Sequence, residues 1–345
     1  MSTKKIADPV EVAQFDLEQA ERPDLEAFYE LWMTARAVDR PEDDVAYSFD
    51  EWVAAARQPS AGLGTRAIWV ARDAGRIVAS AIVSYLEEEN SGVALTDITV
   101  SPELRRNGVG TATLRAVLPE LEAQGRTVVE GWDLTEGGAG HKWADAVEMH
   151  TAKATVIQLL KFADVDPATW EVPVPTGYRL ESWVDATPGD LVASYANALS
   201  AMRDAPAGTS SVQQPEWTVE RVRASETETR ETGVERRVVA AVCESTGEVV
   251  GLTRMDIYST APTWGHQLDT VVEPSHRGHG LGLCIKAHMA RLLRAERSEV
   301  DRVYTGTNAD NDHMIRINHR MGFTTARRTV GVNATIAELR VALGV

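Results

Sequence analysis

The chain has 345 residues, which is long for a single hydrophobic core and suits two domains of ordinary length. Its 35 basic and 51 acidic side chains give a formal net charge of −16, which disfavours binding to nucleic acid or anionic membranes and favours a cationic amine. The two cysteines, Cys243 and Cys284, cannot build a disulfide framework or a cysteine zinc site, so no metal is expected.

The sequence also indicates a compartment. Met1 to Lys5 lead into acidic residues without an apolar stretch, and no later stretch is apolar for long enough to span a bilayer. A cytoplasmic protein is expected. The predominance of arginine over lysine, with many alanines and valines, fits a bacterial coding bias and says nothing about function.

Hydrophobic periodicity and turn residues predict an alternation of helices and strands in the first half. The predicted strands are 10–15, the hairpin 65–86, 93–100, 127–133 and 154–162. The predicted helices are 22–37, 49–57, 110–123 and 141–147. Residues 164–176 carry three prolines, which a helix or a central strand tolerates poorly, and are predicted to be a linker.

The second half repeats this order from Tyr178 onward. The predicted strands are the hairpin 238–258, 264–272, 301–307 and 324–333, and the predicted helices are 188–202, 216–225, 281–295 and 311–320. The domain prediction is therefore 1–163 for the first domain, 164–176 for the linker and 177–345 for the second domain.

Three features of the first half recur in the second half at one constant offset. The hairpin turn around Gly75 matches that around Gly247, and Asp97-Ile98-Thr99-Val100 matches Asp269-Thr270-Val271-Val272. The Arg-x-x-Gly-x-Gly stretch also occurs twice, as 105–110 and 277–282. Chance similarity would drift in register, so the constant offset indicates two copies of one domain.

A strand followed by Arg-x-x-Gly-x-Gly and a helix is suited to hold a pyrophosphate. The first N–H groups of a helix have no intrahelical partner and lie at the positive end of its dipole. Glycine lets an anion approach closely, and arginine adds charged donors. A glycine turn that merely joins strand to helix is the alternative, and its recurrence in two copies argues against it.

Two other phosphate loops do not fit. A Walker A loop needs Lys followed by Ser or Thr after the last glycine, where this chain has Thr111-Ala112 and Leu283-Cys284. A dinucleotide fingerprint needs a third glycine three positions after the second, and the candidate slots hold other residues.

At these residues both halves of the chain resemble the GNAT superfamily of N-acetyltransferases, in the tandem, mycothiol-synthase-like arrangement. The resemblance implies an α/β (mixed α+β) fold with two GNAT-like domains, each a mixed, mostly antiparallel split sheet flanked by helices. It also implies that acetyl-CoA, as co-substrate, lies in the split between the fourth and fifth strands. The residues it assigns to coenzyme A in the second copy are Val271, Val272, Arg277, Gly278, His279, Gly280, Leu281, Gly282 and Asn311. Their first-copy counterparts are Val100, Arg105, Arg106, Asn107, Gly108, Val109 and Gly110.

Attack of an amine on a thioester requires the amine to lose a proton. The family often places a carboxylate six residues before the conserved valine of the fourth strand, where this chain has His266 in the second copy and Ala94 in the first. Histidine titrates near neutrality and can take the proton, whereas alanine cannot. The alternative for His266 is a strand-start residue packed beside Trp264 at a sheet edge. Asp269 is a second candidate, but strand alternation predicts that it faces away from His266.

The segment from Asn311 to Phe323 resembles a further family element. Where the family often has a tyrosine beside the leaving sulfur, this chain has Asn318, which donates a hydrogen bond but is not a useful acid. We expect Asn318 to steady the thiolate, or alternatively to be a solvated helix residue. The corresponding first-copy slots hold Gly137 and Ala144, so the first copy is expected to be degenerate and the second catalytic.

The expected activity is transfer of an acetyl group to a primary amine of a small molecule. The acceptor loop of the family lies between the first two helices, which places Asp204, Glu216 and the aromatic ring of Trp264 or Trp217 as candidate contacts for a cationic amine. Acetylation of a protein or peptide amine, and a CoA-binding regulatory module without turnover, are the alternatives. The sequence does not indicate an oligomeric state.

Overall fold

A computed structural model describes residues 10–41, 47–59, 62–204 and 208–345, apart from the side chain of residue 204. The chain forms two compact units, and each draws on both halves of the sequence. Unit 1 contains residues 1–154, 208–213 and 329–345, and unit 2 contains residues 155–207 and 214–328. None of the helices among the described residues is long and apolar enough to cross a membrane.

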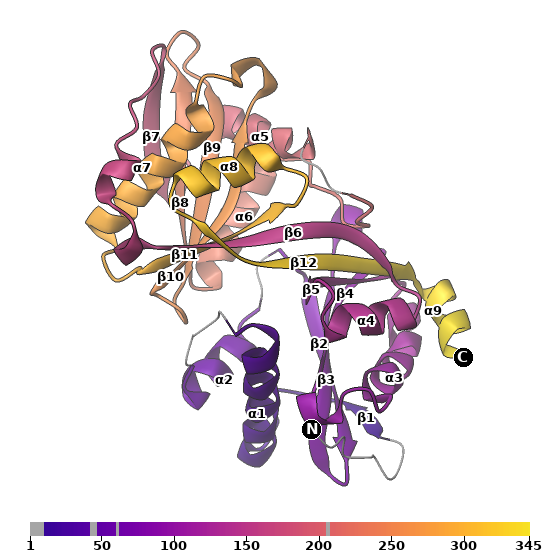
Figure 1. The fold of residues 1–345 in the computed structure, drawn as a ribbon. Coiled ribbons are helices and arrows are strands. Elements are labelled where there is room, and N and C mark those ends of the chain that lie inside the picture. The colour runs from indigo at the N-terminus through magenta and orange to yellow at the C-terminus, as the bar shows by residue number, and fades with distance from the viewer. Residues whose placement is uncertain (1–9, 42–46, 60–61, 205–207) are drawn as a thin grey trace. The chain divides into compact units, whose positions relative to one another are not determined.

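Unit 1 is a mixed sheet with helices on both faces (Figure 1). Its strands, in sheet order, are β1 (Glu11–Gln14), β2 (Thr65–Asp73), β3 (Arg76–Tyr85), β4 (Val93–Val100), β5 (Val128–Thr135) and residues 329–335 of β12 (Thr324–Thr335). Its helices are α1 (Arg22–Asp39), α2 (Phe49–Arg57), α3 (Val109–Ala123), α4 (Ala139–Ala146) and α9 (Ile336–Leu343). Among the described residues of this unit, β4 and β5 pair in parallel, whereas the pairs β1–β2, β2–β3, β3–β4 and β5–β12 are antiparallel.

Unit 2 repeats this architecture. Its strands, in sheet order, are β7 (Tyr178–Val184), β8 (Val234–Cys243), β9 (Val249–Tyr258), β10 (Trp264–Val272), β11 (Arg302–Asn308) and residues 155–161 of β6 (His150–Lys161). Its helices are α5 (Val192–Ser200), α6 (Val219–Glu231), α7 (Leu281–Glu296) and α8 (Asp312–Arg320). The parallel pair is again that of the fourth and fifth strands, β10 and β11.

Alternating side chains of β8 and β9 divide the core of unit 2 into two layers. Val238, Ala240 and Leu252 pack beneath α5 and α6 on one face. Val239 and Ala241 pack against α7 on the other face. The period of two along a strand therefore fixes which residues of β10 face α5 and α6, unless the strand is interrupted.

The predicted boundaries between the two domains differ from the compact units. The last strand of each sheet comes from the other half of the sequence, since residues 155–161 complete unit 2 and residues 329–335 complete unit 1. The predicted linker also contributes to the core of unit 2. Trp170, at the end of a short 3₁₀ helix, is fully buried and donates its indole N–H to the carbonyl of Met321 at 2.9 Å. Burying so large a side chain stabilises a fold, which explains why this proline-rich segment is ordered.

Most of the predicted elements are confirmed within a few residues, and two were missed, the strand β7 and the helix α9. Helix α9 begins with a capping box in which Thr335 and Glu338 each bond the backbone of the other. The sequence carried this signal, Thr-x-x-Glu before an apolar stretch, but the predicted strand was taken to end the fold.

Candidate functional site

The strands β10 and β11 of unit 2 separate part-way along their length. Their parallel pairing joins 264–267 to 302–305 and ends at Gln267 and Thr305, while β10 continues to Val272 and β11 to Asn308. The hydroxyl of Thr305 donates to the carbonyl of Gln267 at 3.2 Å, where the backbone pairing ends. The result is a split in the sheet whose walls are backbone.

A bulge in β10 lies at the same level. The register of β10 on β9 shifts between Gln267 and Thr270, so that Leu268 and Asp269 together face Arg254. The side-chain amide of Gln267 donates to the carbonyl of Arg254 at 2.7 Å, which supplies a hydrogen bond where the bulge interrupts the ladder. The guanidinium of Arg254 forms an ion pair with Asp269.

The bulge overturns one sequence-based prediction. Strand alternation placed His266 and Asp269 on opposite faces, but the additional residue reverses the alternation after Gln267. His266 is paired with Asp256, and Asp269 with Arg254, two residues earlier on β9. Both side chains therefore lie on the face covered by α5 and α6.

His266 lies inside the sheet and not at an edge, because β10 is paired on both sides. Its ring is partly exposed and packs edge-on against Tyr258 at 5.0 Å and, tilted, near Tyr304 at 6.0 Å between centroids. The edge-strand alternative for His266 is therefore wrong. Trp264, a predicted acceptor contact, is buried at the start of β10, with the guanidinium of Arg302 over its ring at 4.9 Å.

The loop after β10 has the geometry of an anion cradle. The Arg277 side chain folds back and donates from Nε to the carbonyl of Val272 at 3.0 Å, which ties the loop to the strand end. Gly278 and Gly280 have φ of +85° and +79°, a region that favours glycine, and Gly280 is the N-cap of α7. A Cβ built on either glycine would meet no neighbouring heavy atom within 4 Å. Space is thus open beside the first N–H groups of α7, as a bound pyrophosphate requires.

Two histidines border this cradle. Nδ1 of His279 is 3.2 Å from the carbonyl of His276, to which it donates, and Nδ1 of His276 is 2.9 Å from the hydroxyl of Tyr178. Burial raises the pKa of Glu273, which precedes the loop. The nearby charge of Glu248 raises this pKa further, and His276 lowers it in part. The sequence pattern assigned His279 to coenzyme A but did not reveal His276 or Tyr178.

Asn311 is the N-cap of helix α8, and its side chain accepts from the N–H of Met314 at 3.1 Å. Asn318, in the last turn of this helix, is fully buried, so the alternative of a solvated residue is wrong. Its amide donates to Gln158 at 2.8 Å and to the hydroxyl of Thr307 at 3.2 Å. The Oδ1 of Asn318 and the Nε2 of Gln158 are both buried without a hydrogen-bond partner. Such an arrangement is costly and marks a polar position in an apolar layer.

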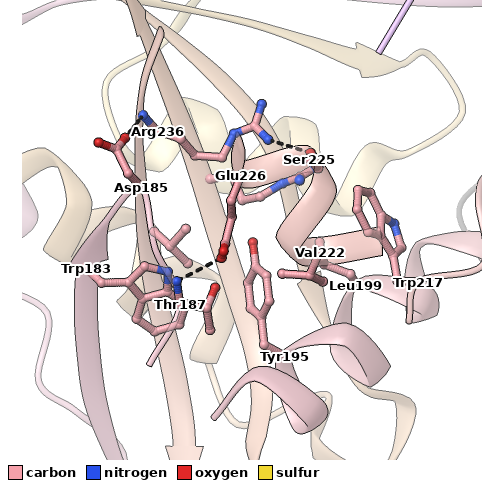
Figure 2. A pocket seen from close by; sticks show the side chains of 12 residues that line it. Trp183, Asp185, Thr187, Tyr195, Leu199, Trp217, Val222, Ser225, Glu226 and Arg236 are labelled. Carbon is pink, nitrogen blue, oxygen red and sulfur yellow. Dashed lines mark hydrogen bonds between the residues drawn. The ribbon is translucent and has the colours of Figure 1, made fainter. Parts of the chain in front are cut away.

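A pocket lies on the α5 and α6 face of unit 2 (Figure 2). It encloses about 250 Å³ of space not filled by atoms, part of it open to solvent. Figure 2 shows Trp183 and Trp217 at its two sides, with Tyr195, Glu226 and Thr187 turned toward one another between them. Burial raises the pKa of Tyr195, while the buried carboxylate of Glu226 accepts from the N–H of Thr187 at 2.8 Å. Apart from Trp217, these pocket residues were not predicted, because they are scattered over β7, β8, β9, α5, α6 and the segments between them.

The predicted acceptor contacts are only partly described. Glu216 is largely exposed and lies 3.5 Å from the guanidinium of Arg203. The side chain of Asp204 lies outside the described residues. Trp217 lines the pocket, and the guanidinium of Arg254 lies over its ring at 5.5 Å.

The first copy has the same loop, and its arginine is bound by a carboxylate. Arg105 donates from Nε to the carbonyl of Val100 at 3.2 Å, and its other two nitrogens bind Asp39 at 2.7 Å each. Gly108 has φ of +80° and caps α3, as Gly280 caps α7. The remaining predicted coenzyme residues of this copy lie in the same loop and the first turn of α3, with Asn107 donating to Leu104 at 3.2 Å.

The first copy has no bulge in β4, and this changes which residue corresponds to His266. The register of β3 on β4 is uninterrupted from 79–85 to 94–100. Ala94 therefore faces the core beneath α3. Leu95 is paired with Ser84, and this is the position that His266 has opposite Asp256 in the second copy. Beside Leu95, the fully buried Glu130 accepts from Ser210 and from the N–H of Ser211 at 2.6 and 2.8 Å. The parallel pairing of β4 and β5 ends at Leu95 and Glu130, so unit 1 has a split of its own, and residues 208–213 cover one face of it.

The model of the acetyltransferase (GNAT) family matches residues 25–137 and 206–323, which is more than half of the chain. Among curated proteins, the mycothiol acetyltransferase of Mycobacterium leprae is 26% identical over 259 residues, which cover 71% of this chain and 76% of the relative.

Two solved structures cover almost the whole chain. One is a tandem GNAT protein from the clavulanic acid biosynthesis pathway, with a TM-score of 0.72, 25% identity and coverage of 95% of this chain and 98% of the other. The other is a GCN5-related N-acetyltransferase from Sphaerobacter thermophilus, with a TM-score of 0.72, 17% identity and coverage of 96% and 97%. The latter likeness concerns the fold alone.

Proposed function

The chain belongs to the GNAT family of acetyltransferases, and from this premise we propose that it is an acetyl-CoA-dependent N-acetyltransferase with one working site, in unit 2. The observation that carries the proposal is the open split between β10 and β11 beside the glycine-capped N-terminus of α7. A thioester with a long amide-bearing arm and a pyrophosphate needs both features, a strand edge to pair with and an anion cradle.

The residues assigned to the co-substrate fit these requirements. The loop from Arg277 to Gly282 would hold the pyrophosphate through backbone N–H groups, and the backbone at Val271 and Val272 would pair with the amide arm. Bound there, acetyl-CoA would supply the activated acetyl group.

His266 is the proposed general base. Its imidazole would take a proton from the acceptor amine, directly or through water, as the amine nitrogen forms its bond to the acetyl carbon. The carbon–sulfur bond then breaks and its electron pair leaves with sulfur. Asn318 is buried and donates its amide N–H groups to Gln158 and Thr307, so it has none left to offer the thiolate and would act only by ordering that polar cluster.

The acceptor is proposed to be a primary amine of a small molecule. The acidic chain, with a formal net charge of −16, favours a cation. The pocket of Figure 2 lies on the same face as His266, and its lining holds two tryptophans, the carboxylates of Asp185 and Glu226, and the guanidinium groups of Arg236 and Arg254. The aromatic faces suit an ammonium group, while the carboxylate of Glu226 is already bound by Arg223. The relatives named for mycothiol and for the clavulanic acid pathway fit a small acceptor.

The test is a thiol-release assay with acetyl-CoA and a panel of small amines, run beside calorimetry for CoA binding. Acetyl transfer to at least one amine, with one equivalent of CoA bound per chain, is expected. CoA binding without release for any amine would favour the alternative of a regulatory module. Release only with a peptide amine would favour the other alternative, protein acetylation.

A further inference from the structure

We propose that Arg254 is a positioning residue that, through its ion pair with Asp269, holds the bulge of β10 and so keeps His266 on the face covered by α5 and α6. The consequence for catalysis rests on the proposed function. The structural part, that Arg254 fixes the register of β10, stands on the geometry of unit 2 alone.

A bulge needs side chains to hold it, because the additional residue leaves backbone groups without ladder partners. Three side chains do so here. The amide of Gln267 donates to the carbonyl of Arg254 at 2.7 Å and to the hydroxyl of Thr253 at 2.8 Å. Leu268 and Asp269 both lie opposite Arg254 on β9, and Arg254 binds the carboxylate of Asp269.

Arg254 is well placed for this role. Its side chain is 11% exposed and that of Asp269 is 24% exposed, so the pair is shielded from water and from screening. Trp217 covers the guanidinium, with 5.5 Å from the central carbon to the ring centroid. Burial alone would lower the pKa of Arg254, but the charge of Asp269 raises it above its ordinary value. The arginine therefore stays charged, and losing it would leave a partly buried carboxylate without its counter-ion.

The first copy provides a natural comparison. It keeps the aspartate as Asp97, but Ile82 stands in place of Arg254 and Leu95 in place of Gln267, and the strand pair has no bulge. Asp97 faces Ile82 in place of an arginine and is exposed to solvent; desolvation raises its pKa, and the charge of Arg40 lowers it in part. The bulge is thus present in the copy that has Arg254 and Gln267 and absent in the copy that lacks both.

The register of β10 decides where the proposed base lies. A slip by one residue turns every side chain of a strand to the other face. If β10 lost its bulge, His266 would turn toward α7 as Ala94 turns toward α3, and Gln267 would take its place on the α5 and α6 face. Arg254 therefore acts on the proposed base through the strand, and its side chain also lines the pocket of Figure 2.

The experiment compares Arg254→Ile, the first-copy residue, with Arg254→Lys. For Arg254→Ile we expect kcat to fall by about 100-fold, as for loss of a general base, while KM for acetyl-CoA changes by less than about threefold. The rise of kcat with pH that comes from deprotonation of a general base should disappear. The lysine variant keeps the charge, although it loses the forked geometry, and should recover part of kcat.

Amide hydrogen exchange reports on the bulge without any turnover. In Arg254→Ile, peptides covering 266–272 should exchange faster, whereas Arg297→Met, which removes the pairs to Glu235 and Glu299 beyond the end of α7, should leave this segment unchanged. If Arg254→Ile does not fold, the double variant R254I/D269N removes both charges and carries the same expectation. Unchanged exchange at 266–272 in a folded variant would overturn the inference. A wild-type protein that releases no thiol would overturn the proposed function while leaving the exchange result to decide this inference.

Discussion

The fourth strands of the two copies differ more than the hairpins that precede them. The β2–β3 and β8–β9 hairpins each shift register at the equivalent place. In β2–β3 the shift lies between Ala71 and Arg72 and leaves Val78 without a paired residue. In β8–β9 it lies between Ala241 and Val242 and leaves Val250 without one. The following pairs diverge, since β10 is bulged on β9 and β4 is regular on β3. The shared backbone framework is thus compatible with two registers of the strand that carries the proposed base. Side chains at a few positions decide between them.

The anion loops show the opposite behaviour. In both copies an arginine Nε caps the carbonyl at the strand end, and a glycine with φ near +80° begins the helix. In the first copy the side chain of Asn107 donates to the carbonyl of Leu104 at 3.2 Å, and in the second copy that of His279 donates to the carbonyl of His276 at 3.2 Å. The loop geometry is therefore retained where the register of the strand is not.

The largest effect is expected for His266→Ala. Loss of a general base should lower kcat by about 100- to 10,000-fold. The matched change in the first copy is Leu95→Ala. Leu95 lies opposite Ser84 on β3, the position that corresponds to that of His266 opposite Asp256 on β9. Leu95→Ala should leave kcat within about twofold, because no base is present there. Steady-state kinetics on both variants decides the point, and equal losses would show that the copies do not differ in the way proposed.

The two copies also differ at Lys286, a position that affects the free energy of unfolding. It is buried in α7, with its ammonium 5.4 Å from the Phe323 ring, and burial lowers its pKa to about 7. The equivalent residue of α3 is the buried Leu114. The lysine must lose its proton or be buried charged, so it destabilises the fold most at pH values below its folded pKa. This cost shrinks as pH rises from about 7 toward the unfolded value of about 10.4.

We therefore expect Lys286→Leu to raise the free energy of unfolding by up to roughly 5 kcal/mol at pH 6, because each pKa unit corresponds to about 1.36 kcal/mol. The gain should diminish steadily above pH 7 and nearly vanish at about pH 10.5. Urea unfolding at pH 6, 8 and 10 measures it, with Lys161→Leu on an exposed strand position as the control. A gain that does not depend on pH would mean that charge burial is not its cause.

The third test concerns Gly280 and Gly108. A valine at either position must adopt a positive φ, which strains a branched residue, and its side chain would enter the open space beside the helix N-terminus. Gly280→Val should raise KM for acetyl-CoA by about 10- to 100-fold, which corresponds to about 1.4 to 2.8 kcal/mol. Gly108→Val should leave thiol release unchanged. If Gly108→Val impairs turnover as strongly as Gly280→Val, the first copy holds the co-substrate of the reaction.

Much of the fold could be predicted from the sequence, because its main signals are local. The glycine turns, the arginine loop and the 3.6-residue periodicity of 281–295 each lie within one short window, and the strand 264–272 was predicted with the bounds that the structure has. The exchange of the last strands between the halves was not predicted. Residues 154–162 and 324–333 read as strands, but nothing in either says which sheet it joins.

The candidate site shows the same limit more sharply. The placement of Asp269 relative to His266 was wrong because one bulge reverses strand alternation, and its cause lies in Arg254, on a different strand. The burial of Asn318 depends on Gln158, which is distant in the sequence. Residue types at fixed spacing can indicate an anion loop, but side-chain partners across a sheet are beyond such a pattern.

The smallest effect is expected for Asp39→Asn in the first copy. The pair of Asp39 and Arg105 is bidentate at 2.7 Å, but the aspartate side chain is 45% exposed, so its loss should cost no more than about 1 kcal/mol of stability. The change removes a negative charge beside the first anion loop, where a pyrophosphate would otherwise be repelled. Calorimetry should then detect a second, weaker equivalent of CoA, while thiol release stays at the wild-type rate. A stoichiometry that remains at one would show that Asp39 does not limit binding there, and that residues 208–213 over Glu130 are the stronger obstacle.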